Sequence, residues 1–218
     1  KNYPIFKIEE NIDNGYCISL VENDGERTFI TMPGLELSMK EKWFEHIKIN
    51  NYDYIYLGND IVATSGFIIN SKKSKVTIDG TYNNTKYTYT NNLSLEAEVI
   101  KVSTTNKKII LKNMNIVSSH GYGVVYVPHP NYSNVIVEYN KINFNGIELS
   151  CNYYGTTKII DSVIEAKDTN NVSVQKVCDS NRIIIGGTST ITSSSSTNQV
   201  FFFNDVIPSS VKVMPNSR

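Results

Sequence analysis

Two stretches of the chain decide its predicted fold. Lys108–Ile116 reads KIILKNMNI and Asn134–Ile142 reads NVIVEYNKI. In each, a β-branched run is followed by polar turn residues and then by an isolated apolar residue. The stretches TKIIDSVI (Thr157–Ile164) and RIIIGGTSTI (Arg182–Ile191) repeat the pattern. A repeat of this length predicts a solenoid in which each repeat supplies one coil. The aligned last residues are Ile116, Ile142, Ile164 and Ile191, at steps of 26, 22 and 27 residues.

Asparagines punctuate the predicted strand ends in phase with this repeat. Asn tolerates left-handed backbone and can hydrogen-bond along a stack of equivalent neighbours, so such bends let consecutive coils pair in parallel. We therefore predict an all-β fold, a right-handed parallel β-helix. A β-sandwich, built from alternating strands on tight hairpins, is the competing architecture. The asparagines concerned are Asn113, Asn115, Asn140, Asn143 and Asn145.

Short β-branched and aromatic runs predict strands along almost the whole chain, because Asn, Gly, Ser and Asp separate them. A turn around Asp24-Gly25 is predicted to join the first two runs as a hairpin. The clear runs are 16–21, 27–31, 54–57, 67–69, 75–78, 99–102, 109–111, 123–127, 135–137, 158–160, 172–174, 182–185, 200–203 and 211–213.

One helix is predicted, over Ser38–Ile47 (SMKEKWFEHI), where Ser38 and Glu41 have the spacing of a capping box. A solenoid exposes its terminal coil as strand edges, so this helix is expected to cover the first coil. The predicted organisation is an N-terminal segment over residues 1–41, which contributes to this cap, and a β-helix domain over 42–218.

Composition excludes some classes of partner. The 21 basic and 21 acidic residues give a formal net charge of zero, whereas a nucleic-acid partner needs a concentrated basic field. No apolar stretch is long enough to span a bilayer, so membrane insertion is not expected. Cys17, Cys151 and Cys178 lack zinc-site spacing. Cys151 and Cys178 are either a bridge between neighbouring coils or two buried thiols.

The start and end of the chain indicate a segment of something larger. The chain opens at Lys1 without an apolar signal core, and its end carries no wall-anchor motif. We therefore expect it to be part of a larger protein.

Six motifs between Lys42 and Ile191 carry a resemblance to a known family. They resemble the pectate-lyase-like adhesive domain of surface proteins from low-GC Gram-positive bacteria. The resemblance implies a β-helix shaped like pectate lyase, extracellular on the bacterial cell surface and used for attachment. The motifs are Trp43 with YDYIYLGNDI (Tyr52–Ile61), KVTIDGTYN (Lys75–Asn83), IILKNMNI (Ile109–Ile116), GYGVVYVP (Gly121–Pro128), NVIVEYNKINFNG (Asn134–Gly146) and RIIIGGTSTI (Arg182–Ile191).

A second resemblance lies in residues 5–56. GYCISLVENDGERTFITMPGLE (Gly15–Glu36) and KEKWFEHI (Lys40–Ile47) are similar to a ribokinase-type sugar kinase, in which this segment contributes to the β-strand lid over the sugar. Leu35 stands where that family commonly has Ala. The nucleotide-binding half and the Gly-rich motif with its catalytic Asp are missing, so no kinase activity is expected.

Catalytic chemistry is weakly indicated. A lyase would need clustered carboxylates holding Ca²⁺ beside a basic residue that abstracts a proton. Glu138 and Asp161 fall at similar repeat phase and are predicted to project from one face; ordinary solvated side chains are the alternative. His120 and His129 are interpreted as loop histidines, and no catalytic residue, metal or cofactor is predicted. The carboxylate candidates are Glu138, Glu148, Asp161 and Glu165, with Lys158 or Arg182 as base.

Tyrosines offer the best indication of binding. Exposed tyrosines beside Asn and Thr suit glycan or protein contacts, because they supply apolar area and a hydroxyl at low entropic cost. Predicted loops Thr81–Glu98 and Pro128–Asn134 are where such contacts are expected, although packing on strand faces would also explain the tyrosines. We predict a non-catalytic adhesion module for a glycan or an extracellular protein; the alternative is a carbohydrate-active enzyme on an acidic polysaccharide. The candidate binding residues are Tyr87, Tyr89, Tyr122, Tyr126, Tyr132, Tyr153 and Tyr154.

Overall fold

The computed structural model describes most of the predicted β-helix and one hairpin before it. Residues 16–21, 27–32, 53–69, 73–93, 100–128, 132–167, 177–194, 201–202 and 210–215 are described. The chain divides into two compact units, Lys1–Lys48 and Ile49–Arg218. The predicted helix Ser38–Ile47, the domain boundary at 41–42 and the predicted strand 172–174 lie outside the described residues. None of the described residues form a helix that is long and apolar enough to cross a membrane.

The first unit contains a hairpin. Strands β1 (Tyr16–Val21) and β2 (Arg27–Met32) pair antiparallel, from Tyr16 opposite Met32 to Val21 opposite Arg27. The predicted pairing of the first two strands is therefore confirmed. The turn predicted around Asp24-Gly25 lies outside the described residues.

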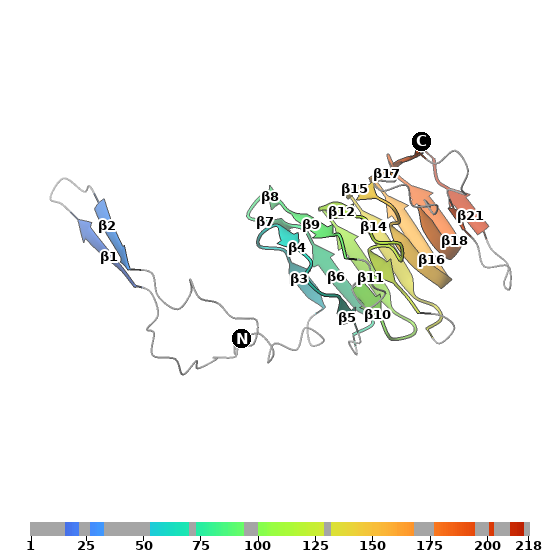
Figure 1. Cartoon of the computed structure of the whole chain (residues 1–218), viewed down its shortest axis with the longest axis horizontal. Helices are drawn as coiled ribbons and strands as arrows, with labels where there is room; N and C mark the ends of the chain where they lie inside the picture. The colour runs from blue at the N-terminus through green and yellow to red at the C-terminus, as the bar shows by residue number, and fades with distance from the viewer. Residues whose placement is uncertain are drawn as a thin grey trace. The chain divides into compact units, whose positions relative to one another are not determined.

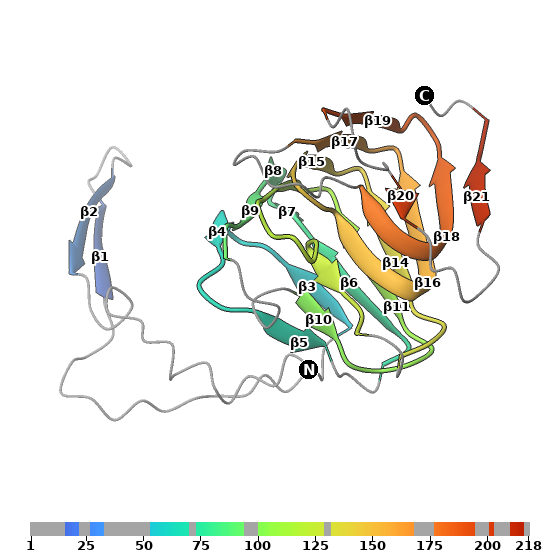
Figure 2. The ribbon, with the colours of Figure 1, turned by 45° about the vertical axis from the view of Figure 1, so that its right-hand side comes forward.

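The second unit is a parallel β-helix whose strands form three faces (Figures 1 and 2). Equivalent strands of successive coils pair in parallel on every face, which confirms the predicted architecture over the β-sandwich. Face 1 contains β3 (Tyr54–Tyr56), β6 (Lys75–Asp79), β11 (Lys108–Lys112), β14 (Ile136–Asn140), the later parts of β16 (Ser150–Ile160) and β18 (Cys178–Gly186), and β21 (Ser210–Val213). Face 2 contains β4 (Ile61–Val62), β9 (Thr88–Asn91), β12 (Asn115–Ser118), β15 (Asn143–Gly146), β17 (Val163–Ala166) and β19 (Thr190–Ser193). Face 3 contains β5 (Phe67–Ile69), β10 (Ile100–Val102), β13 (Val125–Tyr126), the first parts of β16 and β18, and β20 (Phe201–Phe202).

The core is a line of apolar side chains inside the coil. Inward positions on face 2 stack in register, so that each buried residue lies against its counterpart one coil away. Burial of such a stack supplies the hydrophobic stabilisation that a single coil could not provide. The stack on face 2 consists of Tyr89, Ile116, Phe144, Ile164 and Ile191.

The predicted alignment of the repeat is wrong at one coil. Ile116 pairs with Phe144, not with Ile142, which lies two residues earlier and is also fully buried. Residues two apart on a strand point the same way, so the apolar pattern alone does not distinguish these registers. The observed step between equivalent residues is 28 from Asn115 to Asn143.

A left-handed backbone bend occupies the corner between faces 1 and 2. The residue that follows β11, β14, β16 or β18 has positive φ: 52° at Asn113, 55° at Lys141, 48° at Asp161 and 64° at Gly187. Left-handed backbone is costly for most side chains and cheapest for Gly and Asn. The corner therefore requires a left-handed backbone conformation, and four different residue types adopt it at this position.

Asparagine stacks tie neighbouring coils together, as predicted. The amide of Asn143 donates to the Asn115 side-chain oxygen at 3.2 Å. A second stack, missed from the sequence, joins Asn134 to Asn106 at 3.2 Å, and both residues have left-handed backbone. Each of these side-chain hydrogen bonds favours the observed register of adjacent coils.

The segment Thr81–Glu98, predicted as a loop, contains three short strands in its described part. It begins with an antiparallel hairpin of β7 (Thr81–Tyr82) and β8 (Thr85–Lys86) and continues into β9. Residues 94–99 are outside the described part. The polar composition that suggests a loop here comes from outward-facing strand positions and from the turn residues Asn83 and Asn84.

Asp79 joins the first coils of face 1. Its carboxylate accepts the Tyr54 hydroxyl at 2.7 Å and the Asn113 amide at 3.0 Å, and pairs with the Lys112 ammonium at 3.0 Å. Burial alone would raise the pKa of Asp79, but the hydrogen bonds from Tyr54, Asn113 and Lys112 hold it below its ordinary value. The ionised carboxylate therefore holds three coils in register.

Lys141→Asn is expected to raise the free energy of unfolding by roughly 0.5–1 kcal/mol, because Asn adopts the left-handed bend at lower cost than Lys. Lys141→Val should lower it by about 1–2 kcal/mol, since a β-branched residue fits that bend worst. Urea denaturation measures both. Equal stability of the two variants would show that the corner carries no backbone strain at this position.

Asp79→Asn is expected to lower the free energy of unfolding at pH 7 by about 1–3 kcal/mol, because it removes a buried charged acceptor. The pKa of Asp79 is lower in the folded chain than its ordinary value of 3.8, which applies in the unfolded chain. The ionised carboxylate therefore contributes stability above pH 3.8, and this contribution is lost as the pH falls through the lower folded pKa. The difference between wild type and variant should thus be constant near neutral pH and shrink below about pH 4. Urea midpoints across this range would test it, and a difference unchanged at pH 3 would contradict it.

Candidate functional site

A row of outward-facing residues crosses face 3. Ile68, Lys101, Tyr126, Cys151 and Asp179 lie next to one another in register on five successive strands. Their neighbours along each strand point into the core because side chains alternate. Exposure falls along this outer row, from 55% at Ile68 to 0% at Asp179. One end of the row is therefore open to solvent and the other is covered.

The open part of the row carries an aromatic shelf, which we define as Lys101, Tyr122 and Tyr126. The ring of Tyr122, which is 42% exposed, lies 5.4 Å from that of Tyr126. The Lys101 ammonium lies 5.7 Å from the centre of the Tyr126 ring. His120 supports the shelf from below: it is fully buried, and its Nδ1 accepts the backbone N–H of Tyr122 at 3.1 Å. The shelf thus presents two ordered rings and a cation.

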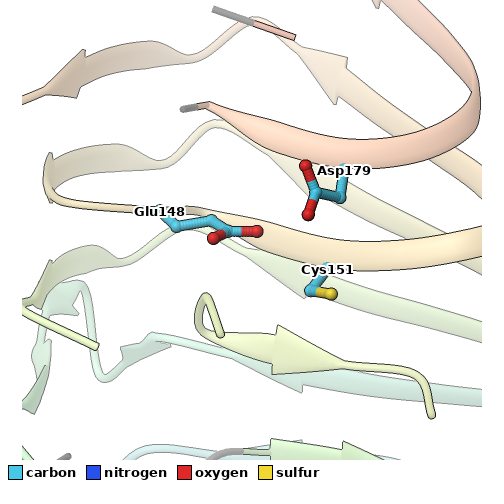
Figure 3. A group of neighbouring side chains, drawn as sticks. All are labelled: Glu148, Cys151 and Asp179. Carbon is cyan, nitrogen blue, oxygen red and sulfur yellow. The ribbon is translucent and has the colours of Figure 1, made fainter. Parts of the chain in front are cut away.

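The covered part of the row carries a buried acidic cluster of Glu148, Cys151 and Asp179. Their oxygen and sulfur atoms all lie within 4.8 Å of one another, and Figure 3 shows the three side chains gathered together. Cys151 comes from β16, Asp179 from the neighbouring strand β18, and Glu148 from the segment that precedes β16. Their exposed fractions are 1%, 2% and 0% for Glu148, Cys151 and Asp179.

Two tyrosines near the cluster have raised pKa values. Burial raises the pKa of the Tyr153 hydroxyl, and the charges of Cys151 and Asp179 raise it further. Tyr153 also shares a hydrogen bond with the Asp179 carboxylate. Tyr139, whose hydroxyl donates to the Leu149 carbonyl at 2.8 Å, likewise has a raised pKa, chiefly through burial. Anionic forms are therefore disfavoured throughout this region.

Two carboxylates and a thiol at this separation have two chemical options. They can share protons, because like charges a few ångströms apart in a buried site do not all ionise together. They can also supply three ligands to a divalent cation such as Zn²⁺, which accepts both sulfur and oxygen donors and leaves a fourth position for water. The sequence by itself predicts no metal here. The ligand spacing has no motif, and only the pairing of β16 with β18 brings Cys151 to Asp179.

The structure brings three of the predicted binding tyrosines to face 3. Tyr122 and Tyr126 form the shelf, and Tyr153 lies against Asp179. The prediction for Tyr89 is wrong: only 7% exposed, it packs in the face 2 stack, because it occupies an inward strand position and not a loop. Tyr87 and Tyr132 are half-buried against the core, and Tyr154 is also half-buried.

The predicted carboxylate group is dispersed. Glu138 lies on face 1 and pairs with Lys108 at 2.7 Å, whereas Glu165 lies on face 2 beside Lys167. The predicted shared phase of Glu138 and Asp161 is wrong. Glu138 is in register with Lys158, and Asp161 is the left-handed corner residue, which accepts the Thr188 N–H at 3.0 Å. Of the proposed bases, Lys158 lies on face 1 beside Glu138, and Arg182 is exposed at the start of the later part of β18.

The cysteine alternatives are resolved in favour of thiols. Cys151 and Cys178 are both buried, and they form no disulfide with each other. Cys178 is in register with Ser150, one residue away from Cys151, so the two side chains leave opposite sides of the sheet. Of the two histidines, His120 is buried and His129 lies outside the described residues.

Sequence reasoning missed a cluster of exposed tyrosines on face 1. The cluster consists of Tyr54, Tyr56 and Tyr82, which are 39%, 55% and 48% exposed. The ring of Tyr56 lies between those of Tyr54 and Tyr82 and is close to both. The alternation of Tyr54 and Tyr56 around inward Ile55 was the available signal, since it places both tyrosines on the outer side of a strand.

Comparisons with known proteins bear on the N-terminal part of the chain. The uncharacterized sugar kinase YegV of Escherichia coli K12 is 39% identical over 52 residues, which make up 24% of this chain and 16% of that protein. The matched segment agrees with the resemblance noted for the N-terminal residues. No family model and no solved structure matches the chain. The β-helix is therefore known from its own strand pairing.

Asp179→Asn is expected to raise the melting temperature by several degrees at pH 7 in EDTA, because it removes one negative charge from a buried acidic cluster at little change in shape. Glu165→Gln is the matched control: its carboxylate is half-exposed beside Lys167, so its effect should be close to zero. Thermal unfolding followed by circular dichroism measures both. A lower melting temperature for Asp179→Asn would contradict the expected repulsion.

Proposed function

We propose that this chain is a non-catalytic binding module of the bacterial cell surface that holds a glycan against the outer row of face 3. The observation that carries the proposal is the aromatic shelf, in which the tilted rings of Tyr122 and Tyr126 lie 5.4 Å apart beside Lys101. Tyrosine rings supply apolar area for the C–H faces of sugars, and their hydroxyls and a nearby cation supply polar contacts. The buried His120 accepts the Tyr122 backbone N–H, and its ring lies 5.9 Å from the Tyr122 ring. This part of the shelf is positioned before binding, which lowers the entropic cost.

The surface location and the larger context are further parts of this proposal. The resemblance to the pectate-lyase-like adhesive domain supports an extracellular module within a larger Gram-positive surface protein, whose partner is a glycan or an extracellular protein. The β-helix is consistent with such a role because its stacked coils are rigid and expose long faces. The neutral formal charge supports the exclusion of nucleic acid.

A second candidate function is enzymatic action on an acidic polysaccharide. Glu148 and Asp179 favour it, because Asp179 lies on the same row as the shelf and Glu148 lies beside Asp179. Both carboxyl groups are at most 1% exposed, so a polysaccharide reaches them only if the covering residues move. We rank binding above catalysis for this reason.

Tyr122→Ala and Tyr126→Ala together are expected to weaken binding to the glycan selected on an array by roughly tenfold or more, because aromatic anchors dominate binding energy. Val117→Ala is the matched control, since Val117 is also 42% exposed but lies on face 2. Affinity is measured by biolayer interferometry. Unchanged affinity in the double variant would overturn the face 3 site.

Polygalacturonate turnover with Ca²⁺, followed by the absorbance of unsaturated product, separates the two candidates. We expect no product from the wild-type chain. Release of product that is abolished by Asp179→Asn would favour the enzyme and displace the binding module as the main function.

A further inference from the structure

The corner after β6 differs from the corners after β11, β14, β16 and β18. At those four corners a single left-handed residue, such as Asn113 or Lys141, carries the chain from face 1 to face 2. Between β6 and β9 this corner is replaced by the β7–β8 hairpin, whose turn residues Asn83 and Asn84 both have positive φ. Positive φ at both turn residues is typical of two-residue hairpin loops, because it matches the twist of the two flanking strands. The other corners show that coil stacking does not require it, and insertions in solenoids gather on binding faces.

The hairpin brings a third tyrosine to an exposed pair. Tyr82 of β7 lies 6.2 Å from Tyr56 between ring centres, and Tyr56 lies 4.8 Å from Tyr54. The rings are tilted by 59° and 38°, so they form a curved surface. We call Tyr54, Tyr56 and Tyr82 the tyrosine cluster. Tyr56 and Tyr82 are 55% and 48% exposed, far more than core tyrosines such as Tyr139.

The cluster is fixed before any ligand arrives. The Tyr54 hydroxyl donates to Asp79, and the Lys112 ammonium lies 5.1 Å from the centre of the Tyr54 ring while it pairs with the same carboxylate. The backbone N–H of Thr81, the first residue of the hairpin, also donates to Asp79 at 3.1 Å. One buried carboxylate therefore positions both the strand and the hairpin that carry the rings, which lowers the entropic cost of binding.

The chemistry of the cluster selects among ligand classes. Lys112, the cation against the rings, is neutralised by Asp79, so the cluster lacks the cationic character that an acidic polymer or nucleic acid requires. Protein hot spots also use tyrosine, together with Trp and Arg, but this cluster contains neither Trp nor Arg. The exposed asparagines 83 and 84 beside it supply amide donors and acceptors for hydroxyl groups. Rings with polar neighbours suit a sugar, whose C–H face stacks while its hydroxyls are hydrogen-bonded.

We propose that Tyr54, Tyr56 and Tyr82, together with the β7–β8 hairpin, form a second binding site, for an uncharged polysaccharide. Sugar rings stack on Tyr56 and Tyr82, and Tyr54 buttresses Tyr56. The site is on face 1 and its adjoining corner, whereas the aromatic shelf is on face 3, so the two act independently. A single chain of the protein then engages a polymer or a mixed surface at two places, which increases avidity without new contacts.

The test is binding of the full chain to three neutral polysaccharides, laminarin, galactomannan and xyloglucan, measured by affinity electrophoresis and biolayer interferometry. Wild-type protein is expected to bind at least one of them. Tyr56→Ala with Tyr82→Ala should weaken that binding at least tenfold, whereas Val163→Ala, at a 45% exposed position of β17 on face 2, should leave it within twofold. Absence of wild-type binding to all three, or equal binding by the Tyr56/Tyr82 variant, overturns the site.

A second measurement guards against misfolding of the variant. In wild-type protein with isotope-labelled tyrosine, the neutral polysaccharide that binds should shift the ring resonances of Tyr56 and Tyr82 and spare those of Tyr122 and Tyr126. The reverse pattern assigns neutral-sugar binding to the face 3 shelf and overturns the second site. Loss of glycan binding in the face 3 variant alone bears only on the function proposed above.

Discussion

The left-handed bend between faces 1 and 2 is the constraint on which the rest of the coil depends. One residue must turn the chain sharply enough for the next strand to begin within two or three positions, at Asn113, Lys141, Asp161 and Gly187 alike. Because these bends are equivalent from coil to coil, the strands that enter and leave them pair in register. The face 2 stack of apolar side chains follows from that register. A shift of one residue would turn the stack outward.

A tight corner also determines where additional structure is found. The coil interior is filled by the stacked core, so an inserted segment projects outward. The β7–β8 hairpin is such an insertion, and it completes an exposed tyrosine cluster at the edge of face 1. The outer row of face 3 arises differently, because its residues occupy ordinary outward positions on successive strands. Regular stacking thus produces one candidate surface, and an interruption of the stacking produces the other.

Sequence reasoning recovered faces 1 and 3 far better than face 2. Strands such as β11 and β18 contain continuous β-branched runs, which are the strongest strand signal in a single sequence. The face 2 strands are short and mostly polar; β12, NIVS, and β15, NFNG, each have one large inward residue. From the sequence, Ile116 is identified only as an isolated apolar position, and Ile142 is aligned with it in place of Phe144. For the same reason Tyr89, which fills an inward position of β9, was taken for a loop residue.

The candidate sites divide in the same way. Tyr122 and Tyr126 are four residues apart in one motif, so their proximity was within reach of the sequence. The contacts among Glu148, Cys151 and Asp179 were not, because they depend on the pairing of β16 with β18. The position of Tyr82 against Tyr56 likewise depends on the path of a hairpin.

By itself, the sequence determined the class of fold, because β-branched runs at a repeat of about one coil, punctuated by asparagines, leave few ways to bury the apolar residues. The sequence also determined some of the left-handed bends, since Asn113 adopts that backbone at low cost. Only the tertiary structure decided the register between coils and therefore which polar residues meet. The physical reason is that alternate residues on a strand face the same way, so shifts of two preserve the apolar pattern. Such a shift changes every contact between neighbouring coils.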